Sequence, residues 1–184
     1  MNEQIITELQ KKLGEKRYMH TIGVAECAEK LAIKYGANPE KAYVAGLLHD
    51  IVKEDTIEQM LLLCENLDID AEMRETRALL HGPAGAEYAK KHFDIDEDIY
   101  NACFYHTVGR ENMSVLEKIV YLADVIEPNR TQPGVEQLRI LAEENLDRAV
   151  LQAMNNTIGY LEKNGMKIHK NSLNARNFLL KNSK

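Results

Sequence analysis

The adjacent pair His49-Asp50 is the part of this sequence best suited to chemistry, because it stands where the apolar segment 45–48 ends. A buried carboxylate is costly to desolvate unless it is paired with a charge or bound to a metal. Imidazole and carboxylate groups are also common ligands of transition metals. A single pair of this kind arises readily by chance, so its meaning depends on the other polar residues of the chain.

Four further ionisable residues lie within or at the end of separate predicted helices: His20, His81, His106 and Asp124. Helical bundles bind metals through side chains that converge from facing helices in this way. Nitrogen and oxygen ligands without thiolates favour Fe, Mn, Ni, Co or Zn over Mg or Ca. Taken singly, an inward histidine is more often a satisfied core residue, and Asp124 could pair with Arg130. Taken together, these residues favour a metal site.

Apolar residues at helical spacing predict that helices position these side chains. The expected helical segments cover residues 3–13, 16–35, 39–50, 55–63, 70–80, 84–92, 94–106, 114–124, a stretch around Leu138 and Leu141, 145–163, and a last short helix. No segment shows the alternating pattern of a strand, so the predicted fold class is all-α.

Several residues mark where these helices should begin and end. The expected signals are Asn38-Pro39 at a helix start, capping boxes at Asp55-x-x-Glu58 and Ser114-x-x-Glu117, a break at Gly82-Pro83, and a cap at Asn171 or Ser172. The break would leave His81 at the end of one helix, facing the common site.

The composition is that of an ordinary globular protein of 184 residues, with 45% hydrophobic and 28% charged residues. No apolar run is long enough to span a membrane, and the N-terminus lacks the pattern of a signal peptide. We therefore expect a cytoplasmic protein without membrane contacts.

The three cysteines include no Cys-x-x-Cys pair, which indicates core residues. A net charge of −6 argues against nonspecific binding to nucleic acid.

The order His20, His49-Asp50, Asp124 resembles the HD-domain superfamily of metal-dependent phosphohydrolases. A longer series of segments is similar to the YqeK family of bacterial symmetrical diadenosine tetraphosphate hydrolases, and it covers nearly the whole chain. These segments are Lys16-Arg17-Tyr18-x-His20-Thr21-x-x-Val24-Ala25, Leu47-Leu48-His49-Asp50-Ile51-x-Lys53, His81-Gly82, His106-Thr107-x-Gly109, Tyr121-Leu122-Ala123-Asp124-x-Ile126-Glu127-Pro128-x-Arg130 and Ala175-Arg176-Asn177.

The resemblance implies a single HD domain over residues 1–184, with a metal-binding core at about 16–130. The C-terminal helices, 134–182, would pack on this core and partly close the site. Iron is the implied metal, as one or two ions, and Mn, Co, Ni or Zn also suit the ligands. The implied principal ligands are His20, His49, Asp50 and Asp124. His81 and His106 would bind either a second metal or a substrate phosphate, and the sequence does not decide between them.

The implied reaction splits diadenosine tetraphosphate into two ADP molecules, with a metal-bound hydroxide as nucleophile. Asp50 could orient the water, and Lys53, three residues later, could neutralise a phosphate as a second catalytic group. The expected substrate contacts are Arg17, Lys53, His81, His106, Thr107, Arg130, Arg176 and Asn177, while Gly109 could let backbone amides approach a phosphate. The alternative for the charged members is a solvated surface position.

Two other functions fit the same motif. Another HD phosphohydrolase would act on nucleoside monophosphates or guanosine polyphosphates with the same ligands. A nucleotide-sensing domain would keep the metal without turnover. The expected partners are a dinucleoside polyphosphate and ADP, and a homodimer is left open. The roles of His169 and of the C-terminal helix are also open.

Overall fold

The computed structural model describes residues 1–182, which contain eleven α-helices and no strand. The predicted all-α fold class is confirmed. The helices are α1 (Asn2–Lys12), α2 (Glu15–Tyr35), α3 (Pro39–Leu48), α4 (Ile57–Leu63), α5 (Ala71–Glu75), α6 (Arg77–His92), α7 (Glu97–Tyr105), α8 (Val115–Ile126), α9 (Val135–Glu144), α10 (Leu146–Lys163) and α11 (Lys170–Asn182).

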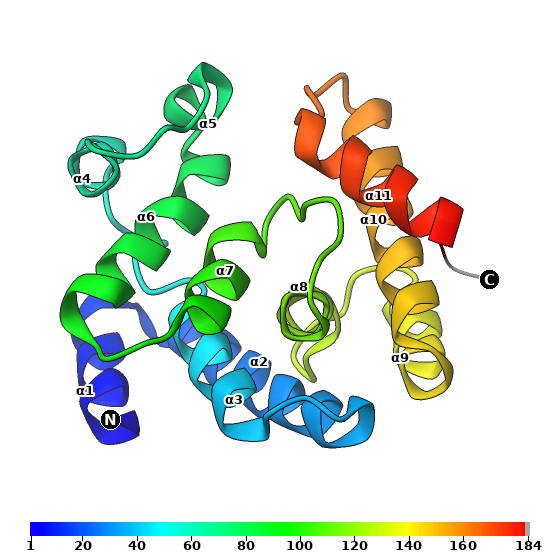
Figure 1. Ribbon diagram of the computed structural model, residues 1–184, viewed down its shortest axis with the longest axis horizontal. Coiled ribbons are helices and arrows are strands. Elements are labelled where there is room, and N and C mark those ends of the chain that lie inside the picture. The colour runs from blue at the N-terminus through cyan, green and yellow to red at the C-terminus, as the bar shows by residue number, and fades with distance from the viewer. Residues whose placement is uncertain (183–184) are drawn as a thin grey trace.

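Helix α8 lies at the centre of the arrangement. Figure 1 shows it end-on, with α2 and α3 below it, α7 to its left, and α9, α10 and α11 on its right. Most of its apolar residues are buried, and Ile119 and Leu122 are fully buried. A polar residue near the end of α8 is therefore held where helices from both sides of the molecule meet.

Helix starts follow the local signals where side chains can cap the free backbone N–H groups. Asn38 caps α3, with Pro39 as its first residue, and its side chain accepts a hydrogen bond from the Lys41 N–H. Ser114 and Glu117 form the expected capping box at α8. These signals fix the direction in which α3 and α8 enter the core.

Two predicted caps are wrong by one or a few residues. The capping box of α4 is formed by Thr56 with Gln59 instead of Asp55 with Glu58. Helix α11 begins at Lys170, before the predicted cap at Asn171 or Ser172. Buried His169 takes the capping role, since its Nδ1 accepts a hydrogen bond from the Asn171 N–H at 3.2 Å.

The predicted break at Gly82-Pro83 is also wrong, because α6 runs through both residues without interruption. Tertiary packing outweighs the local effect of the proline here. A Cβ on Gly82 would lie only 2.7 Å from the carbonyl oxygen of Phe104, so the glycine lets α6 approach the α7 backbone closely. His81 therefore lies in the middle of a helix rather than at its end.

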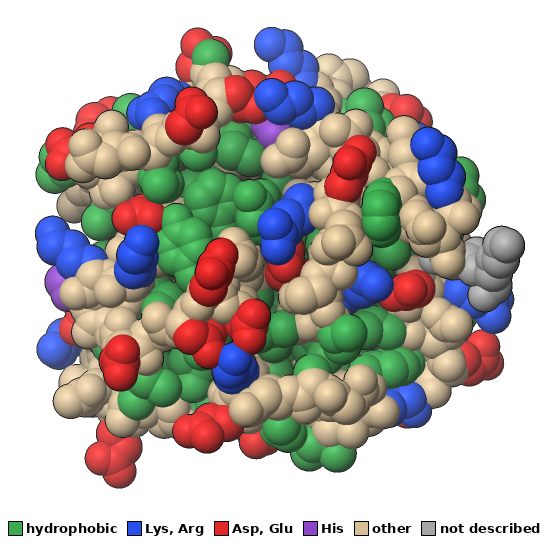
Figure 2. Space-filling view, viewed as in Figure 1, with side chains coloured by type: hydrophobic (Ala, Val, Ile, Leu, Met, Phe, Trp, Pro, Cys, Tyr) green, Lys and Arg blue, Asp and Glu red, His purple; other side chains and the backbone are tan. Residues whose placement is uncertain are grey.

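The three cysteines are free thiols, and two of them lie in the core as predicted. Cys64 and Cys103 are buried, and Cys27 is half-buried. In residues 1–182, no helix combines the length and low polarity needed to cross a lipid bilayer. On the face seen in Figure 2, acidic and basic side chains are interspersed rather than gathered by sign.

We predict that Gly82→Ala destabilises the protein by about 1–3 kcal/mol, because the new methyl group meets backbone atoms of α7 that cannot move aside cheaply. Gly159→Ala is the matched control, since nothing lies within 4 Å of a Cβ at this exposed helical position. The control should gain about 0.5–1 kcal/mol from the lower backbone entropy of alanine. Urea unfolding measures the change in the free energy of unfolding for both variants. Equal changes in the two variants would contradict the close approach of α6 to the α7 backbone.

Candidate metal centre

Side chains from five helical elements converge on one buried place. Helix α2 contributes His20, the end of α3 contributes His49 and Asp50, α6 contributes His81, the end of α7 contributes His106, and α8 contributes Asp124. The sequence placed these residues in separate helices, and the structure brings all six together. Three overlapping groups of them have donor atoms within 4.8 Å of one another.

The first half of the cluster contains the four proposed principal ligands. His20 Nε2 lies 3.0 Å from Asp124 Oδ1 and 3.9 Å from Asp50 Oδ2. His49 Nε2 lies 3.4 Å from Asp50 Oδ2 and 3.9 Å from Asp124 Oδ1. These distances allow one ion between two imidazoles and two carboxylates, with small adjustments of the side chains.

The second half shares Asp50 through its other oxygen. Asp50 Oδ1 lies 3.2 Å from His81 Nε2 and 3.6 Å from His106 Nε2. The two Nε2 atoms of these histidines are 2.9 Å apart. Asp50 thus joins both halves of the cluster, although its side chain is only 2% exposed.

The hydrogen bonds of three histidines determine which nitrogen faces the cluster. The Nδ1 atoms of His49 and His106 lie 2.7 Å from the carbonyl oxygens of Gly46 and Cys103. A carbonyl can only accept, so Nδ1 of each neutral ring carries the proton. The Nδ1 of His20 lies 3.1 Å from the Glu127 carboxylate and is held in the same way. Each of these rings presents an Nε2 lone pair to the cluster.

This arrangement fits a divalent metal ion. His49 Nε2 and Asp50 Oδ1 are buried and have no hydrogen-bond partner within residues 1–182. An unpaired buried polar atom costs about 1–3 kcal/mol, and a cation would satisfy both atoms. Metal-binding histidines commonly donate their other ring N–H to a carbonyl or carboxylate, as His20, His49 and His106 do here.

The electrostatics of the cluster keep its carboxylates ionised. Burial alone would raise the pKa of Asp50, but its electrostatic interaction with His49 and its contacts with the neighbouring histidines hold this pKa well below its usual range. The pKa of Asp124 is likewise lowered, because its hydrogen bond with His20 and nearby positive charges outweigh burial. Burial lowers the pKa of His81 to about 4, so this ring is neutral at pH 7.

Lys53 lies inside the second half of the cluster. Its Nζ is 2.8 Å from His81 Nε2 and 3.3 Å from Asp50 Oδ1. The Thr107 hydroxyl is 3.2 Å from the Nε2 atoms of both His81 and His106. An ammonium group and a hydroxyl group therefore already lie within hydrogen-bonding distance of the lone pairs of this half.

Two guanidinium groups border the first half. Arg17 Nη1 donates to Asp50 Oδ2 at 2.9 Å, and Arg130 Nη2 donates to Asp124 Oδ1 at 2.6 Å. A cavity of about 260 Å³ opens beside them. It is lined by Lys16, Arg17, His20, Glu54, Glu127, Asn129 and Arg130. Substrate atoms entering this cavity would meet both guanidinium groups next to the cluster.

Arg176 and Asn177, the last two expected substrate contacts, are not part of the cluster. Within residues 1–182, no hydrogen bond or ion pair links Arg176 or Asn177 to a cluster residue. Their neighbour Ala175 is buried, and its Cβ would lie 3.1 Å from a Cβ on Gly109. Helix α11 therefore reaches the loop after His106, but its polar residues are not part of the cluster.

Sequence reasoning gave no role to Glu127, which is buried and holds His20. The signal was its spacing, because Glu127 follows Asp124 by about one helical turn. Its second oxygen accepts a hydrogen bond from the Asn129 N–H at 2.7 Å. A Cβ on Gly23 would lie 2.5 Å from that oxygen, so the glycine leaves the space that the carboxylate occupies.

His169, whose role the sequence leaves open, lies in the loop directly before α11. It is buried, and its Nε2 lies 3.0 Å from the Asp70 carboxylate, at the start of α5. It therefore ties α11 to α5 and contacts no cluster residue among residues 1–182. His92 is exposed and stacks on Tyr88 with ring centroids 4.2 Å apart.

Comparison with known families agrees with the geometry of the cluster. The model of the HD domain matches residues 17–129, the part of the chain that contains every cluster residue. A crystal structure of a predicted HD superfamily hydrolase involved in NAD metabolism, from Clostridium acetobutylicum, is similar over 98% of this chain and 97% of that chain. Its TM-score is 0.95 and its sequence identity is 43%.

Two curated relatives extend over nearly all of the chain. The symmetrical bis(5'-nucleosyl)-tetraphosphatase of Halalkalibacterium halodurans is 45% identical over 91% of this chain and 91% of its own length. The protein of the same name from Bacillus subtilis is 37% identical over 98% of both chains. The resemblance found in the motifs is thus confirmed by whole-chain similarity.

We predict that Mn²⁺ stabilises the metal-free protein against unfolding, because an ion that binds only the folded state shifts the equilibrium by mass action. At a concentration one hundred times its dissociation constant the gain should be about 2.7 kcal/mol. His49→Ala should abolish the gain, whereas His92→Ala, which changes an exposed ring, should keep it. Urea unfolding with and without Mn²⁺ measures the difference. A gain that survives in His49→Ala would argue against this cluster as the site.

Proposed function

The chain belongs to the HD domain family, and from that membership we propose that it is a metal-dependent hydrolase that cleaves diadenosine tetraphosphate symmetrically into two ADP molecules. The observation that carries this proposal is the buried set of imidazole lone pairs and ionised carboxylates in the domain that it shares with the two named tetraphosphatases. Such a set supports the binding of a divalent metal next to a phosphate substrate.

We assign His20, His49, Asp50 and Asp124 as the principal metal ligands. Their mutual distances, and the engagement of both imidazole Nδ1 atoms, support this assignment. When bound, a divalent metal lowers the pKa of water toward about 7 and withdraws charge from a phosphoryl oxygen. Iron is our proposed metal from the family resemblance, and the same nitrogen and oxygen donors also suit Mn, Co, Ni or Zn.

The roles of His81 and His106 follow from the position of Lys53. Its ammonium group lies 2.8 Å from His81 Nε2 and 3.3 Å from Asp50 Oδ1, where a second cation would lie. Repulsion between like charges disfavours a metal ion at so short a distance from an ammonium. We therefore propose one metal per chain, with His81, His106 and Lys53 contacting a phosphate of the substrate.

The charges around the cluster suit a polyphosphate. Asp50 pairs with Arg17 and Lys53, and Asp124 pairs with Arg130. A third carboxylate, that of Glu127, is buried against His20. These formal charges cancel, so a bound divalent metal leaves a positive surplus for the anionic substrate. Arg130 can offer its planar guanidinium to two phosphate oxygens at once, and Thr107 can donate its hydroxyl hydrogen.

Asp50 has the geometry to orient the attacking water. Its Oδ1 atom is buried and accepts no hydrogen bond within residues 1–182, so besides its ion pair with Lys53 at 3.3 Å it can accept a hydrogen bond from that water. Attack on the second phosphorus from one adenosine forms a new P–O bond and breaks the bond to the bridging oxygen. Lys53 can neutralise the charge that develops on the phosphoryl oxygens. The departing group is then ADP, and the attacked half also becomes ADP.

The remaining features stay predictions. Arg176 and Asn177 are proposed to close over a nucleotide from α11, helped by the C-terminal helices 134–182. The single-domain organisation and the cytoplasmic location rest on the sequence alone, and a homodimer is left open. The rival assignments, another nucleotide phosphohydrolase or a nonturnover sensor, would use the same ligands, so product analysis must separate them from our proposal.

We predict that the metal-loaded protein converts diadenosine tetraphosphate into ADP as the sole nucleotide product. In ¹⁸O-labelled water, half of the ADP molecules should carry one labelled oxygen on the terminal phosphate, because one water enters for each bond broken. Mass spectrometry of the products measures both results. AMP with ATP would refute symmetrical cleavage, and release of inorganic phosphate from a nucleoside monophosphate would favour the rival enzyme.

We also predict one metal ion per chain by elemental analysis. Lys53→Met should lower kcat/KM for diadenosine tetraphosphate about 10–100-fold, because a charge-assisted phosphate contact contributes about 1.5–3 kcal/mol. Lys167→Met is the control, since Lys167 is exposed and forms no ion pair within residues 1–182. Two ions per chain in the unmodified protein would contradict the place given to Lys53.

A further inference from the structure

The segment between α8 and α9 contributes two side chains that contact proposed metal ligands. Directly after α8, Glu127 reaches His20 Nδ1 at 3.1 Å, and Arg130 reaches Asp124 Oδ1 at 2.6 Å. The Arg130 Nε also donates to the Asp124 carbonyl oxygen at 2.7 Å. Residues 127–130 lie outside any helix, so the position of these two side chains depends on what fixes this loop.

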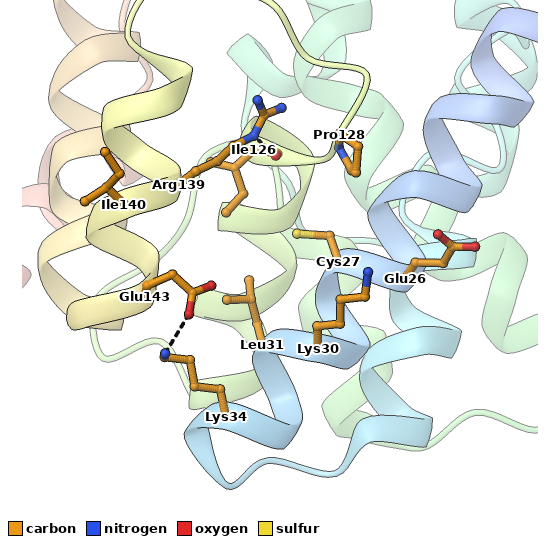
Figure 3. Close-up of a pocket in the computed structure, with 10 residues that line it drawn as sticks. All are labelled: Glu26, Cys27, Lys30, Leu31, Lys34, Ile126, Pro128, Arg139, Ile140 and Glu143. Atoms are coloured by element: carbon orange, nitrogen blue, oxygen red, sulfur yellow. Dashed lines mark hydrogen bonds and ion pairs between the residues drawn. The ribbon is translucent and has the colours of Figure 1, made fainter.

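Arg139 on α9 fixes the loop from its other side. Its Nε donates to the Ile126 carbonyl oxygen at 2.9 Å, and its Nη2 donates to those of Glu127 and Arg130 at 2.7 and 3.0 Å. Its Nη1 donates to the Glu136 carboxylate. Figure 3 shows Arg139 at the cavity of about 640 Å³ between α2 and α9, with its guanidinium directed toward Ile126 and away from the cavity.

We infer that Arg139 is a positioning residue for the metal centre: it holds the backbone of residues 126–130 so that Glu127 keeps His20 in its metal-binding orientation. The inference rests on the proposed metal site. Arg139 contacts no cluster residue among residues 1–182, so any effect on the metal passes through the loop. Helix α9 also lies beyond residues 17–129, the part matched by the HD domain model.

The chemistry of the guanidinium group explains why arginine is needed here. Three carbonyl oxygens from one loop can be reached together only by a planar group with several N–H donors. Lysine has a single ammonium on a flexible stem, so it cannot reproduce this pattern. The side chain is 27% exposed, so its replacement removes loop contacts without opening the apolar core.

Binding of Mn²⁺ to the metal-free protein tests the inference without substrate. Isothermal titration should give an affinity about 10-fold weaker in Arg139→Met and in Arg139→Lys, because partners behind metal-binding histidines are typically worth 10–100-fold in affinity. Glu136→Gln is the control, since it removes only the anchor of Nη1 and keeps the three carbonyl contacts. Its affinity should stay within twofold of that of the unmodified protein.

A double-mutant cycle separates positioning from general loosening of the structure. Glu127→Gln should weaken Mn²⁺ binding alone, and Arg139→Met should add little to it, since both act through the same contact with His20. Unchanged Mn²⁺ affinity in both Arg139 variants, or fully additive losses in the double variant, would overturn the inference.

This outcome is distinct from failure of the proposed function. If the protein cleaves another nucleotide, the Mn²⁺ affinities still report on Arg139. If the unmodified protein binds no Mn²⁺ at the cluster, the proposed metal site fails first, and the inference falls with it. Loss of binding in His49→Ala identifies the cluster as the place where the titrated ion binds.

Discussion

The buried carboxylate of Asp50 is the constraint on which the rest of the structure depends. It is 1% exposed and accepts contacts from Arg17, Lys53 and the imidazoles around it. A carboxylate at this depth must be compensated, or it would take up a proton or unfold the surrounding chain. The compensation comes from different helices, so the requirements of one anion determine how those helices meet. Packing and electrostatics are therefore inseparable in this core.

The convergence of three cluster members could be predicted from sequence because they occupy equivalent places in their helices. His49, His106 and Asp124 each lie at or near a helix C-terminus, next to apolar residues, so an inward direction followed from the helical pattern. The N-terminal caps of α3 and α8 could also be predicted from the sequence, since a capping interaction involves residues that are close together in the chain. The family resemblance implied that the cluster residues bind a metal, and the comparison over the whole chain confirmed the family.

The features that the sequence did not predict depend on contacts between distant segments of the chain. Pro83 is a helix breaker by its own chemistry, and only the packing of α6 against α7 explains why the helix continues through it. Glu127 and Arg139 look like ordinary surface charges in sequence, because their partners lie elsewhere in the chain. Lys53 was placed near the phosphate from its spacing, but only the three-dimensional arrangement put it beside His81.

The bond between His169 and Asp70 joins residues 99 positions apart, whereas every cluster residue lies between positions 20 and 124. Chains begin to fold from the N-terminus while they are still being made on the ribosome. The metal ligands are therefore all synthesised before α9, α10 and α11, and α5 gains its anchor only after residue 169 has been made. The metal ligands can therefore come together before α11 is made, and α11 is tied to α5 afterwards.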